Sequence, residues 1–218
     1  KSLEFTYPNT TRDPGQDMYS EDAESQTKGG LSVAVPGEVA GLHLMWERHG
    51  ILPWHTLIEP AIELAELGFT VSKYLASSLN SSAEDILADQ GLREVFAPNG
   101  TLLRAGDVCV RTTLANTLRA IAYQGPEAFY RGPIADNLVK DVRDKGGILT
   151  LDDLASYRVQ IRDPIVADIL DLTIYAMPPP SSGGASLAMV RQRFSISLTL
   201  SIHTYIHTYI HTYIHTYI

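Results

Sequence analysis

Two serines in a turn rich in proline and glycine have the residue types and the spacing that chemistry could use. Ser181 and Ser182 lie within Met-Pro-Pro-Pro-Ser-Ser-Gly-Gly, residues 177–184, after a predicted strand. Serine hydroxyls cap helices, and Gly183 and Gly184 allow a backbone or a ligand to approach closely. The segment has no Gly-x-Ser-x-Gly elbow and supplies no base. It therefore favours a turn and a helix cap, with substrate contact or a nucleophilic serine as the alternatives.

Histidine recurs at every fourth position near the end of the chain. The unit Ile-His-Thr-Tyr is written four times over residues 202–217, which does not match the structural repeats of about 20 to 50 residues. Imidazoles at this spacing can chelate a metal ion, but no carboxylate or cysteine lies nearby to complete a site. We interpret residues 191–218 as a low-complexity tail. We expect no metal site there, none at the pair His43 and Glu47, and no cofactor.

Composition and charge exclude several function classes. The 218 residues carry 17 Lys and Arg against 25 Asp and Glu, a formal net charge of −8, and no basic cluster suited to a nucleic acid. No stretch approaches the about 20 apolar residues of a membrane span. The single cysteine, Cys109, forms no intrachain disulfide. Sequons at Asn9, Asn80 and Asn99 are glycosylation candidates if the protein enters the secretory pathway.

Helices precede strands along the chain. Apolar residues at three- and four-residue spacing, closed by glycine, predict helices over residues 36–49, 56–67, 113–124 and 133–145, and a capping box of Thr150 and Asp153 opens a short helix. In the second helix we expect Leu57, Ala61, Leu64 and Ala65 to share the buried face. Asn99-Gly100 predicts a hairpin between residues 94–97 and 101–103.

A two-residue period in the sequence pattern predicts strands over residues 158–162, 165–169 and 172–177. This order indicates an α+β fold. We expect three parts: a polar lead-in over residues 1–30, a main domain over residues 31–190, and the tail.

Several short motifs together resemble the γ-glutamyltransferases, also called glutathione hydrolases or γ-glutamyl transpeptidases, and are most similar to the plant members. They follow the family order from about residue 16 to residue 190: Asp-Met-Tyr at 17–19, Leu-Ser at 31–32 with Val-Pro-Gly-Glu at 35–38, Gly50 with Leu-Pro-Trp at 52–54, Glu-Pro-Ala at 59–61 with Leu-Ala at 64–65, Gly-Phe at 68–69, Gly-Pro at 125–126 with Ala-Phe-Tyr at 128–130, Gly-Gly-Ile at 146–148 with Asp-Leu at 153–154, and residues 178–184.

The resemblance implies part of the large subunit of an N-terminal nucleophile hydrolase, mostly helical with short strands. It implies glutathione or other γ-glutamyl compounds as substrates and a secretory location, extracellular or vacuolar. The family's threonine nucleophile, oxyanion glycines and donor-binding groups belong to its small subunit, and its carboxylate-binding arginine is replaced near Tyr7. No catalytic residue is carried over, so we expect the chain by itself to be inactive. The alternatives are a module that pairs with the small subunit of an intact relative, and an independent serine hydrolase.

Overall fold

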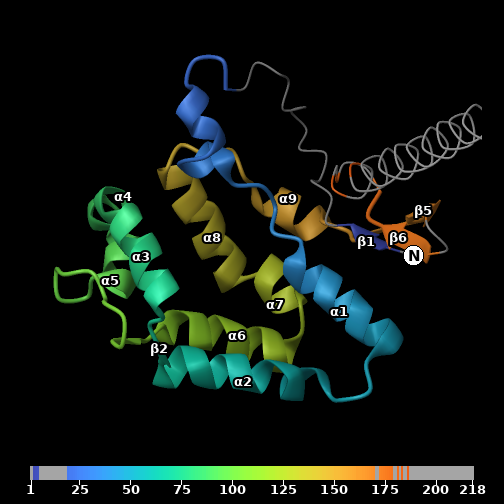
Figure 1. Cartoon of the computed structure of the whole chain (residues 1–218), viewed down its shortest axis with the longest axis horizontal. Coiled ribbons are helices and arrows are strands. Elements are labelled where there is room, and N and C mark those ends of the chain that lie inside the picture. Colours follow the sequence, from blue (N-terminus) through green and yellow to red (C-terminus); the bar gives the residue numbers. More distant parts are fainter. Residues whose placement is uncertain are drawn as a thin grey trace, which may run out of the picture. The chain divides into compact units, whose positions relative to one another are not determined.

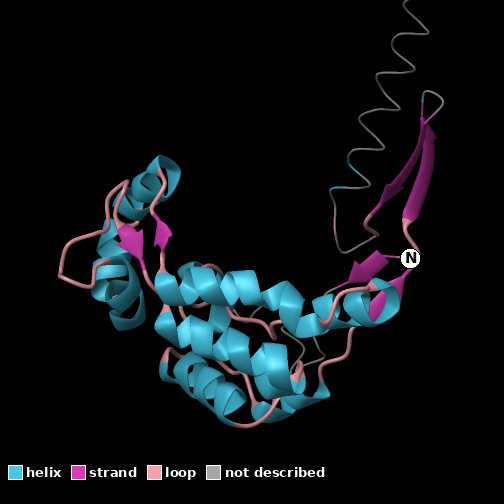
Figure 2. Cartoon of the chain, turned by 90° about the horizontal axis from the view of Figure 1, so that it is seen from below, coloured by secondary structure: helices cyan, strands magenta, loops and turns pink. Residues whose placement is uncertain are grey.

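The computed structural model describes residues 2–4, 19–169, 172–178, 181, 183 and 186. The chain divides into two compact units, one comprising residues 5–159 and the other comprising residues 1–4 with residues 160–218. The described residues are mostly helical, and their strands are short (Figure 2). Among these residues, no helix is long and apolar enough to cross a membrane.

The described residues of the larger unit form a helical assembly (Figure 1) that also contains a small two-stranded sheet. Its elements are η1 (Ala23–Gln26), η2 (Gly30–Ser32), α1 (Glu38–His49), α2 (Trp54–Leu67), β2 (Phe69–Thr70), α3 (Lys73–Ser81), α4 (Ala83–Ala88), α5 (Gln90–Phe96), β3 (Val108–Cys109), α6 (Thr112–Gln124), α7 (Glu127–Tyr130), α8 (Pro133–Asp144) and α9 (Leu151–Ser156). The five predicted helices are confirmed as α1, α2, α6, α8 and α9, while α3, α4, α5 and α7 were not predicted.

The Tyr130 core gathers residues that lie far apart in the sequence. It consists of Val35, Tyr130, Ala135, Val139, Val142, Leu149, Leu154 and Tyr157. The predicted capping box holds α9 against this core, since the Thr150 hydroxyl accepts from the Asp153 backbone N–H at 3.1 Å and the Asp153 carboxylate accepts from the Thr150 N–H at 2.9 Å. This reciprocal pair satisfies backbone donors at the start of the helix.

Glycine is required where η2 meets the end of α8. The Gly30 N–H donates to the Lys145 carbonyl at 2.9 Å. A Cβ atom on Gly30 would lie 2.2 Å from the Val142 carbonyl oxygen and 2.5 Å from the Gly147 nitrogen. Because these neighbours are backbone atoms, they cannot turn aside, and the contact admits only glycine at position 30. The predicted polar lead-in therefore ends in a tight contact with the core.

The α2–α6 pair packs along its length, and its buried face differs from the predicted one. Ile62, Ala65, Ala115 and Ala122 are buried between the helices, which lie side by side in Figure 1. Alanines allow two helices to approach closely. Ala65, which was predicted to lie on the buried face, is buried.

The rest of the predicted face of α2 was wrong, because Leu57, Ala61 and Leu64 are exposed. Apolar residues occupy more than one side of this helix, so their spacing did not determine which side is buried.

The predicted hairpin at Asn99-Gly100 was wrong. Residues 90–96 form α5 because the Asp89 side chain accepts from the Leu92 N–H at 2.9 Å and starts a helix there. The turn itself is present: Gly100 has a φ of 76°, and the Leu103 N–H donates to the Phe96 carbonyl at 2.8 Å. The chain thus reverses after a helix, and returns to a third core built on Val71, Ala76 and Cys109.

The smaller unit contains antiparallel strand pairs. β1 (Ser2–Glu4) pairs with β4 (Gln160–Arg162), and β5 (Ile165–Ile169) pairs with β6 (Leu172–Ala176). The three predicted strands are confirmed as β4, β5 and β6, whereas β1 was not predicted. The described part of the chain therefore combines helices with short antiparallel strands. The predicted boundary at residue 190 and the tail over residues 191–218 lie outside the described residues and stay predictions.

Candidate functional site

A pocket of about 440 Å³ opens in the larger unit, between α1, α7 and the chain that follows α9. It falls in the size range of small-molecule sites, about 300–1,000 Å³. The residues that line it are Ala40, His43, Leu44, Glu47, Pro126, Glu127, Tyr130, Leu154, Ala155, Tyr157, Arg158 and Val159. The lining combines apolar side chains with the titratable residues His43, Glu47 and Glu127 and with two tyrosines.

Tyr130 lines the pocket, and its hydroxyl both donates and accepts a hydrogen bond. The hydroxyl donates to the Pro36 carbonyl at 2.7 Å and accepts from the Ala40 backbone N–H at 3.2 Å. Ala40 is in the first turn of α1, where backbone N–H groups have no partner within the helix. Burial raises the pKa of Tyr130 to about 12, which keeps the phenol neutral. Tyr130 therefore fixes the start of α1 above the pocket.

Tyr157 stacks on Tyr130 but leaves its own hydroxyl unsatisfied. The ring centroids are 5.7 Å apart with an interplanar angle of 8°. Tyr157 is only 5% exposed, and its buried hydroxyl has no hydrogen-bond partner among the described residues. Burial also raises the pKa of Tyr157. Tyr157 thus lines the pocket as a residue, while its neutral hydroxyl is buried away from solvent.

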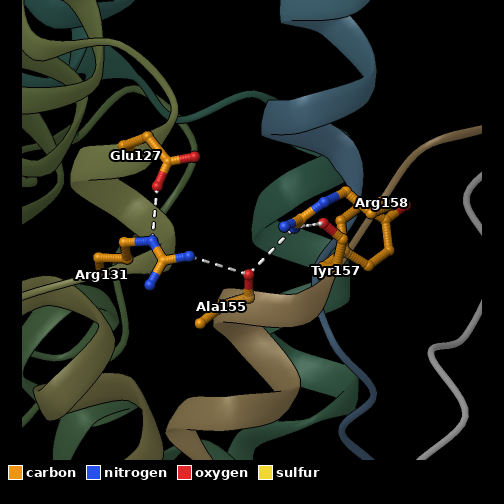
Figure 3. A network of polar contacts seen from close by, with 5 residues as sticks. All are labelled: Glu127, Arg131, Ala155, Tyr157 and Arg158. Atoms are coloured by element: carbon orange, nitrogen blue, oxygen red, sulfur yellow. Dashed lines mark hydrogen bonds and ion pairs between the residues drawn. The ribbon is translucent and has the colours of Figure 1, made fainter.

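Two guanidinium groups meet at the end of α9, beside the pocket (Figure 3). Arg131 Nη2 and Arg158 Nη1 both donate to the Ala155 carbonyl, at 3.3 and 3.0 Å, and Arg158 Nη1 also donates to the Tyr157 carbonyl at 2.6 Å. Arg131 Nε pairs with Glu127 Oε2 at 2.8 Å. Cations are favourable at the carbonyl end of a helix, so the short α9 positions both arginines.

His43 is packed among aromatic rings. Its ring centroid lies 5.2 Å from that of Trp46 and 5.0 Å from that of Trp54, and its Nδ1 lies 3.6 Å from Glu47 Oε1. Within the part of the chain that the structure describes, no group of three or more His, Cys, Asp or Glu side chains could hold a metal ion. His43 and Glu47 both lie in α1 and line the pocket from that side.

The residues singled out in the sequence lie elsewhere or outside the described residues. Ser181 is exposed and its backbone N–H donates to the Pro178 carbonyl at 3.2 Å, and Gly183 is exposed with open space around it. Asn80, in α3, and Asn99, in a turn, are exposed. Ser182, Gly184, Asn9, Tyr7 and the histidine repeat lie outside the described residues. Substrate contact at residues 181–184 stays a prediction.

The pocket residues were not predicted from the sequence as a site. Tyr130 was noted only within a family motif, Arg158 was assigned to the start of a strand, and Tyr157 was assigned to no element. In the sequence, Tyr130 and Tyr157 lie next to apolar residues. This pattern predicts that the two rings are buried, but it does not predict that the Tyr157 hydroxyl is unpaired.

Comparison with known proteins gives consistent matches. The Gamma-glutamyltranspeptidase family model matches residues 10–217. Glutathione hydrolase 2 of Arabidopsis thaliana is 49% identical over 175 residues, which are 80% of this chain and 30% of that protein. Glutathione hydrolase 3 of the same plant is 47% identical over 175 residues, 80% of this chain and 28% of that protein. The chain thus spans about 30% of the length of these relatives.

Solved structures of related enzymes match as well. The crystal structure of Helicobacter pylori gamma-glutamyltranspeptidase matches with a TM-score of 0.73 and 39% identity, over 75% of this chain and 47% of that one. Cephalosporin acylase from Bacillus halodurans matches with a TM-score of 0.64 and 31% identity, over 73% of this chain and 32% of that one.

Proposed function

This chain belongs to the gamma-glutamyltranspeptidase family, and on that premise we propose that its helical unit contributes part of the large subunit of a glutathione hydrolase. The family reaction cleaves the γ-glutamyl amide of glutathione and transfers the γ-glutamyl group to water, an amino acid or a peptide. The observation that carries the proposal is the identity of 49% to a plant glutathione hydrolase across 80% of this chain.

The proposed fold is part of an N-terminal nucleophile hydrolase. In that class the nucleophile is the first residue of a chain, so its own free amine can act as the base. The matches to a gamma-glutamyltranspeptidase and a cephalosporin acylase over part of their chains support this assignment. In this proposal the larger unit supplies scaffold, and the reacting groups come from the family's small subunit.

The 218 residues by themselves are proposed to be inactive. They contain no segment that resembles the family's nucleophile and oxyanion donors, and loss of one oxyanion donor already costs about 10²–10³ in rate. The test is release of p-nitroaniline from γ-glutamyl-p-nitroanilide by the purified chain, with an intact plant relative assayed in parallel. We expect product only from the relative. Turnover by this chain that a glutamine-analogue inhibitor removes would overturn the proposal.

A second candidate function is a non-catalytic module that pairs with an intact relative. The β5–β6 hairpin favours it, because these strands pair only with each other among the described residues and Val166, Leu172 and Tyr175 are exposed. Unpaired strand edges and apolar side chains are sites of association. Co-expression with an intact relative tests this function: co-purification or altered maturation of the relative supports it, and the absence of both removes it.

The proposed location is the secretory pathway. Exposed asparagines in the sequons at Asn80 and Asn99 support it. The test is an antibody against the larger unit, used on fractionated source cells with and without an N-glycan-cleaving enzyme. A protein in the soluble cytosolic fraction whose mobility does not change would contradict this location.

A further inference from the structure

The chain between α5 and β3 contains an asparagine that is followed directly by a glycine. Asn99 and Gly100 are both exposed, and Gly100 has a φ of 76°. A Cβ atom placed on Gly100 would meet no heavy atom of the described residues within 4 Å. The space beside the Gly100 backbone is therefore open.

An asparagine side chain can react with the backbone nitrogen of the residue that follows it. The nitrogen attacks the side-chain amide carbon, ammonia leaves, and a succinimide ring forms. Water then opens the ring at either of its two carbonyl carbons, which gives aspartate or isoaspartate. Glycine in the second position favours the attack, because it has no Cβ atom to obstruct it and its backbone rotates freely.

We propose that Asn99 is a site of spontaneous deamidation in the folded protein. The Gly100 nitrogen forms a bond to Asn99 Cγ, the bond from Cγ to Nδ2 breaks, and Nδ2 leaves as ammonia with the proton of the Gly100 amide. One water molecule then hydrolyses the ring. Either product adds one carboxylate, and so one negative charge at neutral pH. This reaction is independent of the activity proposed above.

A hydrogen bond within the turn controls the rate of the reaction. The Gly100 N–H donates to the Ala97 carbonyl at 2.8 Å, and the nitrogen must lose this partner before it attacks Asn99. The Leu103 N–H, which donates to the Phe96 carbonyl at 2.8 Å, closes the base of the same turn. Exposed turns open locally at a small cost in free energy. The fold therefore slows the reaction at Asn99 and does not prevent it.

Asn80 provides an internal control. It is also exposed, but it lies in the last turn of α3, where backbone N–H groups donate to carbonyls four residues earlier. The next residue is Ser81, which has a Cβ atom and whose hydroxyl donates to the Ser77 carbonyl at 3.0 Å. Attack on the Asn80 side chain requires this end of the helix to unfold. The structure therefore predicts that Asn99 reacts faster than Asn80.

Deamidation also removes the sequon at residues 99–101. Asn99, Gly100 and Thr101 form this sequon, in which the asparagine side-chain nitrogen would carry the glycan. Neither aspartate nor isoaspartate has that nitrogen. Copies of the chain that have reacted at Asn99 can therefore no longer be glycosylated there.

The first test follows the 218-residue chain, made in a bacterial cytosol, as it is kept folded at mildly alkaline pH. Trypsin cleaves after Lys73, Arg93 and Arg104, so Asn80 and Asn99 fall in separate peptides, residues 74–93 and 94–104, each with a single asparagine. We expect peptide 94–104 to gain the mass of an amide-to-acid change and to separate into two products on reversed-phase chromatography. Its rate should exceed that of peptide 74–93 at least about tenfold.

The same measurement in urea tests the contribution of the fold. In the unfolded chain Asn80 loses the protection of α3, and Asn99 loses only the hydrogen bond between Gly100 and Ala97. Both rates should rise, and the ratio of the Asn99 rate to the Asn80 rate should fall at least about threefold. An equal or higher ratio in urea would overturn the assignment of this selectivity to the structure.

Two variants test the chemistry. Gly100→Ala should slow the reaction at Asn99 about tenfold. Because a φ of 76° is strained for alanine, this variant is also measured in urea, where the same slowing should appear. Thr101→Ala is the matched control, since it removes the sequon, keeps Asn99 and Gly100, and should leave the rate unchanged. The absence of both products in a folded chain with helical circular dichroism, or equal rates at Asn99 and Asn80, would overturn the proposal.

Discussion

The Tyr130 core and the α2–α6 pair bury apolar surface in different ways. The Tyr130 core joins residues from Val35 to Tyr157 and fixes them with hydrogen bonds to backbone groups, such as the one from the Tyr130 hydroxyl to Pro36. The α2–α6 pair buries small residues between two neighbouring helices, and Leu57, Leu64 and Leu67 remain exposed. The first region is closed around its own interior, whereas the second presents apolar surface to its surroundings.

The largest expected difference comes from removing a leucine side chain in each region. Leu154 is 1% exposed in the Tyr130 core, and Leu64 is 56% exposed on α2. Leu154→Ala should lower the free energy of unfolding by about 3 kcal/mol, because it loses burial and leaves a cavity. Leu64→Ala should change it by less than about 0.5 kcal/mol. Urea denaturation of both variants measures this, and equal losses would remove the distinction between the regions.

The two stacked tyrosines give the next effect. Tyr130→Phe leaves the Pro36 carbonyl and the Ala40 N–H without their partner, and should cost about 2 kcal/mol. The same change at Tyr157 removes a hydroxyl that has no partner among the described residues and should cost nothing. Thermal unfolding of the two variants provides the comparison. A smaller loss for Tyr130→Phe than for Tyr157→Phe would contradict the hydrogen-bond assignment.

Alkaline pH should weaken the Tyr130 core. The folded-state pKa of Tyr130 is raised to about 12, above the ordinary tyrosine pKa of about 10. The unfolded chain therefore releases this proton first. The stability that Tyr130 contributes is fully present below about pH 10 and falls by about 1.4 kcal/mol per pH unit from there to about pH 12. Urea denaturation from pH 8 to pH 12 should show this slope, and Tyr130→Phe should reduce it.

Replacement of the exposed leucines of α2 should have little effect on stability. It should clearly change the surface of the protein. Replacing Leu57, Leu64 and Leu67 together by Gln should leave the free energy of unfolding within about 1 kcal/mol of its original value. Binding of a hydrophobic dye should fall, because these side chains form exposed apolar surface on α2. Dye fluorescence of the folded protein measures this change. Unchanged fluorescence would place the dye-binding surface elsewhere.

Local sequence signals predicted where elements begin and end. The capping box at Thr150 and Asp153 and the glycine after α6, Gly125, were read correctly because these interactions involve residues a few positions apart. The Asn99-Gly100 turn was also read, but its incoming arm is helical because Asp89 caps α5. A single turn dipeptide does not determine the structure on both of its sides.

Tertiary packing was not predictable from these signals. Leu64 and Ile62 are both apolar residues of α2, and only the position of α6 decides that Ile62 is buried. The pocket could not be predicted for the same reason, since Glu47, Tyr157 and Arg158 come together only when α1 and α9 pack around Tyr130. The unpaired state of the Tyr157 hydroxyl depends on the surrounding atoms and leaves no trace in the sequence pattern.

Cys109 is a probe for local opening of the third core. It is the only cysteine of the chain, it is 0% exposed in β3, and burial raises the pKa of its thiol. A thiol reagent attacks the thiolate and needs access to the sulfur. The rate at which an alkylating reagent labels the native protein therefore reports how often β2 and β3 separate, as amide exchange does for backbone groups. The opening rate of the β2–β3 sheet can therefore be measured at Cys109 without altering the sequence.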